Sequence, residues 1–213
     1  MTPRAAAARK EPTFVEAARR AQIVAAAIDT IAEVGYARAS LARIGERLGI
    51  SKGLISYHFA GKEDLVRQVV AEVIEQGKAY MTPRILAEAS TGTGFLRAYI
   101  ESNLGFMREH PEYMVAIVEI RRNGIGGEGE ERFYGDADID AAAQVLEQHL
   151  ARFQSAGDLG ADFDPRVMAM AIRAAIDSVA RRLARDPSLD VDHYAREIAD
   201  TFERATGPPT GGD

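Results

Sequence analysis

Apolar residues recur along this chain at the spacing of amphipathic helices. Over residues 14–34, Val24, Ala27, Ile28 and Ile31 follow the i, i+3, i+4, i+7 pattern that places side chains on one helix face. The period-two alternation of apolar and polar residues that is typical of strands is almost absent, and alanine, leucine, arginine and glutamate dominate. The pattern therefore predicts an all-α fold.

Two very short helices are predicted after the first one. Ser40 is a suitable N-cap for a helix over residues 41–48, which Gly49 ends, and Ser51 caps a helix over about residues 52–58. Helices of this length are unstable alone in water. Both are therefore expected to pack against the first helix.

The remainder of the chain predicts further helices separated by breaks. A long helix is expected from Lys62 to Tyr80, with Pro83 as a break after it. Residues 123–135 are rich in glycine and glutamate and are predicted to form a mobile loop. The other predicted helices cover residues 95–109, 111–122, 138–156, 164–185 and 190–205.

Two units are expected, an N-terminal one over residues 13–60 and a larger one over residues 61–206, with flexible tails at 1–12 and 207–213. Residues 1–62 hold ten basic and five acidic residues, a net charge of +5, so the remainder carries −11 to reach the total of −6. A basic head on an acidic body suits binding to a polyanion such as DNA. Chance clustering of surface charge is the alternative.

The helix–glycine–helix arrangement of residues 41–58 is typical of a helix-turn-helix motif, whose second helix enters the major groove of DNA. Its spacing fits an ordinary corner between two helices equally well. The run "GYARASLARIGERLGISKGLISYHFAGKEDL", preceded by an amphipathic helix, resembles the TetR family of transcriptional repressors. The resemblance is specific over about residues 14–70, and beyond residue 80 it rests on length and helical layout.

The resemblance implies an N-terminal three-helix helix-turn-helix DNA-binding domain followed by a C-terminal helical domain for ligand binding and dimerisation. It implies that Ser40, Tyr57, His58 and Lys62 contact phosphates. It also implies that Lys52, Gly53, Leu54 and Ser56 lie along the base edges. The predicted DNA contacts are Ser40, Arg43, Ser51, Lys52, Gly53, Leu54, Ser56, Tyr57, His58 and Lys62.

The chain departs from the family pattern at two of these predicted contacts and at one residue beside them. Leu54 stands where a hydroxyl is common, Ser56 where an aromatic ring is common, and Ala42 where an arginine is common. We expect fewer direct base contacts, or packing of Leu54 on a thymine methyl group.

By the same resemblance, the larger domain binds a small molecule and forms a homodimer. A dimer sets two recognition helices about 34–36 Å apart, as half-sites one helical turn apart require. The predicted dimer contacts, for which monomer core is the alternative, are Met168, Ile172, Ile176, Val179, Tyr194, Ile198 and Phe202. The predicted ligand contacts are Phe95, Tyr99, Asn103, Phe106, Met107, Met114, Ile117, Val118, Arg121, His149, Phe153, Met170, Arg173 and Asp177.

We therefore predict a ligand-responsive transcriptional repressor that binds a palindromic operator as a dimer and is released by a small-molecule inducer. The rival interpretations are a small helical enzyme and a protein-binding adaptor that does not bind DNA. The enzyme is disfavoured because GxSxG and HExxH sequences are absent and the four histidines are scattered. No catalytic residue, metal site or cofactor is predicted.

The composition also bears on where the protein works. There is no cysteine, so disulfides and thiolate chemistry are excluded. No apolar run approaches the roughly 18 residues that span a bilayer, and the N-terminus lacks the apolar core of a signal peptide. We expect a cytoplasmic protein without a membrane partner.

Overall fold

The computed structural model describes residues 13–123 and 136–207, and the regular secondary structure of these residues is entirely helical. The all-α prediction is therefore confirmed. The helices are α1 (Phe14–Val34), the 3-10 helix η1 (Tyr36–Arg38), α2 (Leu41–Leu48), α3 (Lys52–His58), α4 (Lys62–Glu88), α5 (Gly92–Glu109), α6 (Pro111–Arg122), α7 (Asp136–Ser155), α8 (Pro165–Leu183) and α9 (Val191–Thr206). Apart from Asn123 and Gly207, the predicted mobile loop and flexible tails lie outside the described residues.

The N-terminal helices begin and end where the local sequence predicts. The Ser40 hydroxyl accepts a hydrogen bond from the backbone N–H of Arg43, and the Ser51 hydroxyl accepts one from Leu54, both at 3.2 Å. Gly49 ends α2 with a φ of 65° and a ψ of 30°, a left-handed conformation that favours glycine. Capping chemistry alone is thus sufficient to delimit α2 and α3.

The prediction for the fourth helix was wrong, because α4 continues through Pro83 to Glu88 instead of ending at Tyr80. Proline removes one backbone donor and crowds the preceding turn, at a cost of about 3 kcal/mol. Packing of α4 along α5 offsets that cost. Arg84 also donates to the Tyr80 carbonyl at 2.6 Å, inside the turn that the proline perturbs.

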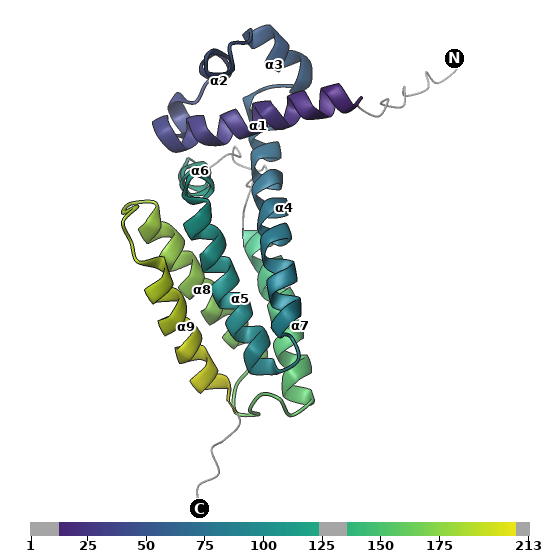
Figure 1. Cartoon of the computed structure of the whole chain (residues 1–213), viewed down its shortest axis with the longest axis vertical. Coiled ribbons are helices and arrows are strands. Elements are labelled where there is room, and N and C mark those ends of the chain that lie inside the picture. The colour runs from purple at the N-terminus through teal and green to yellow at the C-terminus, as the bar shows by residue number, and fades with distance from the viewer. Residues whose placement is uncertain (1–12, 124–135, 208–213) are drawn as a thin grey trace, which may run out of the picture.

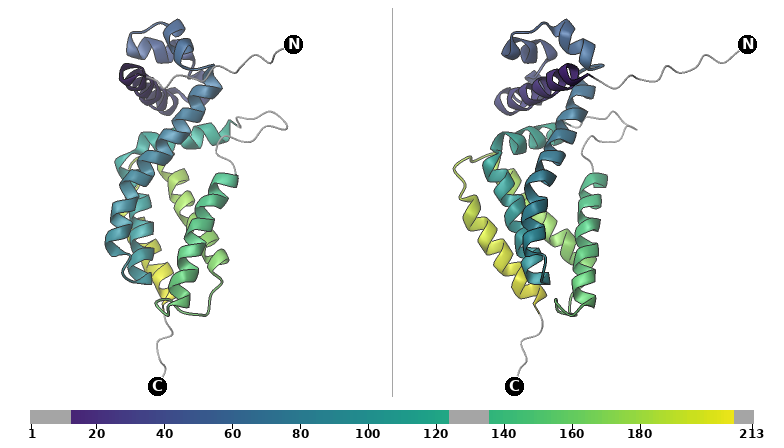
Figure 2. Two further views of the ribbon diagram at one scale, coloured as in Figure 1. Left: turned by 90° about the vertical axis from the view of Figure 1, so that its right-hand side faces the viewer. Right: turned by 45° about the vertical axis from the view of Figure 1, so that its right-hand side comes forward.

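The helices form a head set on an elongated body (Figure 1). The helix α1 lies across the top of α4, and α2 and α3 sit on the far side of α1 from the body. The helix α4 runs from the head into the body, where it packs along α5, and α9 flanks α5. The two further views show α7 on another side of the body, where its partner is α8 (Figure 2).

The core of the head is built from one or two side chains of each short helix. Ile44 of α2, Ile55 of α3 and Phe59 after α3 are at most 2% exposed and belong to the same buried cluster as Ile28 of α1 and Leu65 of α4. Full burial of side chains of this size contributes about 1.5–3 kcal/mol each. These contacts explain how helices too short to be stable alone persist in the head.

Gly45 allows α2 and the following turn to approach closely, as its lack of a side chain suggests. A Cβ atom at this position would stand 2.7 Å from the Ile50 carbonyl oxygen. The backbone N–H of Ile50 donates to the Gly45 carbonyl at 2.9 Å. A backbone atom cannot move aside as a flexible side chain does, so any larger residue here displaces the turn before α3.

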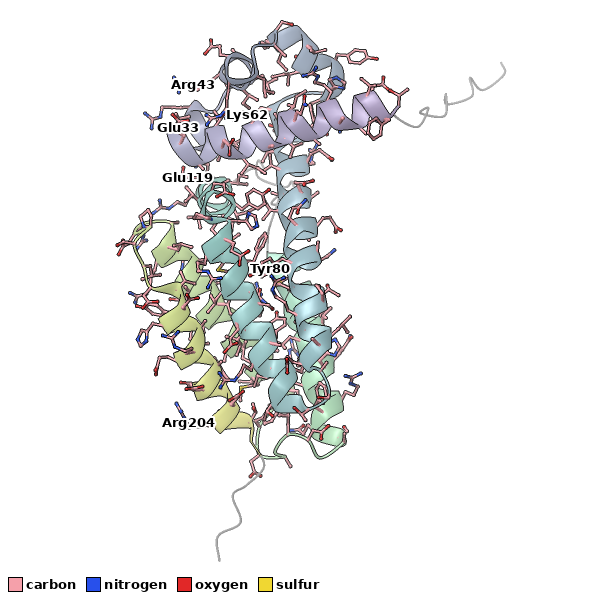
Figure 3. The ribbon with its side chains drawn as sticks, viewed as in Figure 1. Glu33, Arg43, Lys62, Tyr80, Glu119 and Arg204 are labelled. Atoms are coloured by element: carbon pink, nitrogen blue, oxygen red, sulfur yellow. The ribbon has the colours of Figure 1, made fainter. Side chains whose placement is uncertain are left out.

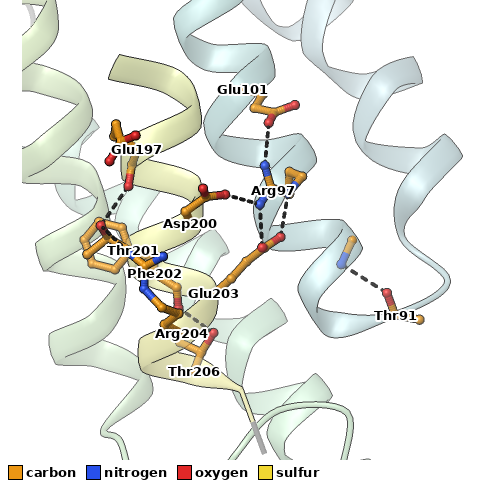
Figure 4. A network of polar contacts seen from close by, with 11 residues as sticks. Thr91, Arg97, Glu101, Glu197, Asp200, Thr201, Phe202, Glu203, Arg204 and Thr206 are labelled. Atoms are coloured by element: carbon orange, nitrogen blue, oxygen red, sulfur yellow. Dashed lines mark hydrogen bonds and ion pairs between the residues drawn. The ribbon is translucent and has the colours of Figure 1, made fainter. Parts of the chain in front are cut away.

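The body is fastened by an ion-pair network between α5 and α9 (Figure 4). The Arg97 guanidinium on α5 lies 2.5 Å from a carboxylate oxygen of Asp200 and 2.5 Å from one of Glu203, both on α9, and 3.0 Å from Glu101. The hydrogen bonds from Glu203 and Asp200 raise the pKa of Arg97, and Arg97 lowers the pKa of Asp200. The network therefore holds the last helix to the body through fully charged partners.

The head and the body meet where α6 packs against α1 and η1. Gly35, which ends α1 with a φ of 79°, faces α6 there. A Cβ atom on Gly35 would lie 3.1 Å from the Glu119 Oε2 atom, so the Glu119 carboxylate closes against the end of α1.

Within the described residues, no helix is long and apolar enough to cross a membrane.

Candidate functional site

The helix α3 is anchored by one side chain and shows most of the others to solvent. Ile55 is completely buried, whereas Tyr57 is 73% exposed and Leu54 is 37% exposed. A helix of seven residues that buries one side chain has little core role of its own. The exposed residues of α3 are Lys52, Gly53, Leu54, Ser56 and Tyr57.

Residues of α2 and of the preceding turn border this surface. Ser40, Arg43 and Ser51 are exposed, and Figure 3 shows Arg43 projecting from α2 on the head. The backbone carbonyl of His58, at the end of α3, accepts a hydrogen bond from Arg20 of α1. The Arg20 guanidinium also lies 4.3 Å from the centre of the Phe59 ring, so it clamps the C-terminal end of α3 to α1.

Tyr57 and His58 form a small aromatic pair at the edge of α3. Their rings meet edge to face with centroids 5.1 Å apart, and His58 is half-buried. The Tyr57 hydroxyl lies 3.5 Å from a carboxylate oxygen of Glu16, at the start of α1. Hydrogen bonds from Thr13 and then from Tyr57 lower the pKa of Glu16, so the carboxylate beside Tyr57 is charged at neutral pH.

Lys62 is engaged inside the head, a contact that nothing in the sequence indicated. Its ammonium donates to the Tyr36 carbonyl at 2.5 Å and lies 4.0 Å from the centre of the Tyr36 ring. Burial lowers the pKa of Lys62. The side chain therefore joins the start of α4 to η1. Gly61 caps α4 without a side-chain hydrogen bond, so the first amide groups of α4 remain as anion donors at this end.

Most of the apolar residues predicted to line a ligand pocket are buried among the packed helices, and their contact with a ligand stays a prediction. At most 8% of each is exposed, and none of them lines either of the two cavities described below. Their rings and chains fill the space between packed helices, which periodicity alone does not distinguish from a pocket. They are Phe95, Phe106, Met107, Met114, Ile117 and Phe153.

A groove of about 760 Å³ lies between α7 and α8. It is lined by three of the predicted ligand residues, Met170, Arg173 and Asp177. At the rim of the groove, Met170 is 61% exposed and Val167 is 56% exposed. The lining residues that were not predicted are Ala143, Gln144, Glu147, Gln148, Arg166, Val167, Ala174 and Arg181.

A polar cluster connects the groove to α5. Arg173 is 9% exposed, and its Nη1 atom lies 3.3 Å from the Tyr99 hydroxyl and 3.2 Å from the Asn103 Oδ1 atom. Its Nη2 atom lies 3.6 Å from a carboxylate oxygen of Asp177. Tyr99 and Asn103 were predicted as pocket residues, and the structure brings both to the inner side of Arg173.

His149 belongs to an aromatic stack rather than to either cavity. Its ring centroid lies 4.7 Å from that of Phe95, which in turn lies 5.4 Å from that of Phe153. Burial, and then the charge of Arg152, lower the pKa of His149, so its ring is neutral at pH 7. The remaining predicted residues, Val118 and Arg121, line a second cavity of about 270 Å³ between α6 and α8.

The predicted dimer surface divides into two groups. Ile172, Ile176 and Val179 of α8 are at most 2% exposed in the single chain, so they are core residues and their assignment to a dimer surface is corrected. Their positions face α5 and α6 because α8 packs on both helices. The half-buried members, which stay available at the surface, are Met168, Tyr194, Ile198 and Phe202.

Comparison with known proteins gives the chain a family. Residues 23–69 match the family model of bacterial regulatory proteins of the tetR family. The regulator BetI 1 of Chromohalobacter salexigens is 33% identical over 85 residues, which is 40% of this chain and 42% of that protein. BetI of Cronobacter sakazakii is 33% identical over 103 residues, 47% of this chain and 50% of that protein. The chain thus spans about half the length or less of these curated relatives.

Solved structures match over almost the whole fold. The transcriptional regulator FadR from Bacillus subtilis, in complex with stearoyl-CoA, has a TM-score of 0.74 at 21% identity and covers 85% of this chain and 96% of its own. The fatty acid degradation regulator FadR from Bacillus halodurans has a TM-score of 0.72 at 18% identity and covers 91% and 96%. At these identities the likeness concerns the fold alone. Residues 23–69 thus belong to the TetR family of bacterial regulatory proteins, and the helical layout of the described chain is similar to that of these solved regulators.

Proposed function

We propose that the chain is a ligand-responsive transcriptional repressor that binds operator DNA as a homodimer. The observation that supports this most directly is α3, which buries Ile55 alone and presents Lys52, Ser56 and Tyr57 to solvent. The helix lies at the outer end of the head, away from the body (Figure 1). A helix entering the major groove needs this combination of a rigid mount and exposed donors.

The proposed contacts divide into base edges and phosphates. Lys52, Gly53 and Ser56 lie along the exposed face that would meet the bases, where Leu54 would pack on a thymine methyl group. The hydroxyl of Tyr57 and the side chains of Ser40 and Arg43 would meet phosphates, as would His58 at the edge of the face. For Lys62 we propose an indirect role: it supports the start of α4, whose amide groups bind the phosphate.

The proposed division of labour follows the two units predicted from the sequence, residues 13–60 for DNA binding and residues 61–206 for regulation. Two recognition helices about 34–36 Å apart need a second copy of the chain. We propose that α8 and α9 of two copies form an antiparallel four-helix bundle through Met168, Tyr194, Ile198 and Phe202. All four are half-buried and pack on the core, as residues at the base of an interface do.

The proposed effector site is the groove between α7 and α8. Its volume of about 760 Å³ falls in the range of small-molecule sites, roughly 300–1,000 Å³. The exposed side chains of Val167 and Met170 offer apolar contact, and Arg173 offers a charged anchor that Tyr99 and Asn103 hold in place. The structurally similar FadR from Bacillus subtilis was solved with a small-molecule ligand, which agrees with a ligand-responsive body.

The path for release leads from this groove to the head. Ligand at Arg173 would shift α5 through Tyr99 and Asn103, and α5 packs on α4, which continues into the head. A tilt of α4 would move the two recognition helices off the one-turn spacing. The ligand must bind the DNA-incompetent state more tightly, because equal affinity for both states shifts nothing.

The decisive experiment is a salt titration of binding to a duplex that carries an inverted repeat from the chain's own promoter region. A repressor binds this duplex more tightly than a scrambled one, and the logarithm of its affinity falls by about 0.9 per neutralised phosphate per unit of log salt. An adaptor or an enzyme binds neither duplex. Absence of binding at low ionic strength contradicts the proposal.

Lys52→Ala tests the face itself, with Lys78→Ala as the matched control. Loss of a base-edge cation should reduce the ratio of operator to scrambled affinity by about tenfold, since a good contact contributes about 1–3 kcal/mol of discrimination. Lys78 lies on the body part of α4 and pairs with Glu75 at 2.8 Å, so its removal should leave the ratio unchanged. Equal ratios in wild type and Lys52→Ala contradict the role of α3.

A further inference from the structure

The second cavity, about 270 Å³ between α6 and α8, concentrates positive charge on the acidic part of the chain. Among the residues that the structure describes, four arginines and one acidic residue, Glu119, line it. The residues after position 62 carry a net charge of −11, so this cluster is opposite in sign to its surroundings. The arginines are Arg121, Arg122, Arg181 and Arg185.

The arginines approach the cavity from two helix ends. Arg121 and Arg122 form the last turn of α6, Arg181 belongs to the last turn of α8, and Arg185 follows it. Val115 and Val118 supply an apolar wall. Arg122 pairs with Glu119 at 3.6 Å, and within residues 13–123 and 136–207 neither Arg181 nor Arg185 has an ion pair with an acidic side chain.

Arginines at helix C-termini also have a simple structural explanation, because cations there offset the helix dipole. That explanation covers each helix end separately. It does not require two helices to direct four guanidinium groups at one cavity, and it predicts no saturable anion binding. The two explanations therefore differ in a measurable quantity.

We propose that this arginine pocket binds a compact polyanion, a small molecule with two or more phosphate or carboxylate groups. The guanidinium group is planar, keeps its charge and matches the oxygens of phosphate and carboxylate in pairs. A volume of about 270 Å³ suits a ligand smaller than the one that the larger groove would hold. The site is distinct from that groove: among the described lining residues, the two share Arg181 alone.

The position of Glu119 gives the pocket a route to the head. Figure 3 shows Glu119 on α6 directly beneath α1. Its carboxylate pairs with Arg122 on one side and closes against Gly35, the end of α1, on the other. A polyanion at Arg122 competes with Glu119 and weakens the contact between α6 and α1. This regulatory step, unlike the binding step, rests on the proposed repressor function.

Binding is tested by calorimetric titration of the full chain with pyrophosphate, and separately with citrate, at constant ionic strength. Arg185→Gln should weaken pyrophosphate binding by about fivefold, the upper end of what one exposed ion pair contributes. Arg182→Gln is the matched control, because Arg182 is exposed near the end of α8, three residues before Arg185, and lines neither cavity. It should bind as the wild type does. Comparison of the two anions distinguishes phosphate from carboxylate selectivity.

Two outcomes overturn the pocket: absence of saturable binding of either anion to the wild type, or equal losses in Arg185→Gln and Arg182→Gln. Circular dichroism verifies that both variants are folded. The regulatory step is tested by operator affinity with and without saturating pyrophosphate, in wild type and in Arg185→Gln. If pyrophosphate weakens operator affinity in the wild type but not in Arg185→Gln, coupling is supported. Equal weakening of operator affinity in both proteins overturns it. If the anion binds but no duplex does, the pocket stands and the repressor proposal fails.

Discussion

The head and the body of this protein use their helices in opposite ways. In the head, α2 and α3 each bury one side chain fully and expose most of the others, so the candidate DNA contacts are on the surface. In the body, α5 buries ten residues over its length because neighbours cover it on several sides. A residue's exposure is therefore simple to predict in the head and difficult in the body.

The difference extends to how each region is held together. The head depends on a small apolar centre formed by short helices around α1, with one close backbone approach at Gly45. The body adds polar fasteners between long helices, such as Arg97 with α9 and Arg173 with α5. We expect single substitutions to damage the head more than comparable changes to polar groups damage the body.

The largest expected effect is that of Phe59→Ala. It removes a ring that is 2% exposed at the centre of the head and the partner of the Arg20 guanidinium. Large-to-small core changes of this kind cost about 3–5 kcal/mol of the free energy of unfolding. Chemical denaturation measures the loss, and Phe14→Ala, at an 89% exposed position, is the control with almost no change. Similar stabilities of the two variants would contradict the packing described for the head.

Gly45→Ala should have the next largest effect, about 2 kcal/mol, because its Cβ atom would stand 2.7 Å from the Ile50 carbonyl oxygen and force the turn to move. Gly53→Ala is the matched control on the neighbouring helix. Its Cβ atom would meet nothing closer than 3.7 Å, so the variant should be as stable as the wild type or more stable by up to about 1 kcal/mol. Thermal unfolding of both variants measures these changes in stability. A Gly45→Ala variant as stable as the wild type would refute the close approach at Gly45.

Lys62→Met is expected to cost about 1 kcal/mol, since the Tyr36 carbonyl loses its hydrogen bond. Burial lowers the Lys62 pKa below its usual value of 10.5, so the folded chain loses this proton at a lower pH than the unfolded chain does. The Lys62 contribution to stability should therefore rise with pH between the lowered pKa and 10.5. Denaturation at several alkaline pH values measures it. If the free energy of unfolding changes with pH in Lys62→Met as it does in the wild type, the burial of this ammonium is contradicted.

Arg97→Met should have the smallest effect, less than about 1 kcal/mol, because the ion pairs it removes are partly exposed and screened by salt. High salt should reduce the difference from wild type. Pairing with Arg97 lowers the Asp200 pKa below 3.8, so this stabilisation is present at neutral pH and disappears as the pH falls through the lowered pKa. Arg166→Met, an exposed arginine of the groove, is the control. If the difference in stability between Arg97→Met and the wild type persists in acid or in high salt, Arg97 acts through packing.

Prediction from the sequence succeeded where the decisive interactions are local. The serine caps at positions 40 and 51 and the glycine at 49 act on residues within one turn, so the bounds of α2 and α3 follow from them. It failed at Pro83, where packing of α4 on α5 outweighs a local helix-breaking preference. For Phe95 and Phe106 the sequence leaves the role open, because the same apolar spacing describes a core and a pocket lining, and the structure shows that both rings are buried.

The sequence by itself determined that this is a helical chain with a capped pair of short helices that carry the basic, hydroxyl and aromatic residues of a candidate DNA-contacting face. Only the tertiary structure decided which side chains meet across it: Lys62 with Tyr36, Arg173 with Asn103, and the arginines of α6 and α8 around one cavity. The physical reason is the separation along the chain of the residues that interact. Caps and turns are settled by atoms a few residues apart, whereas these contacts join residues between 26 and 70 positions apart, or the ends of two separate helices, and depend on how whole helices pack.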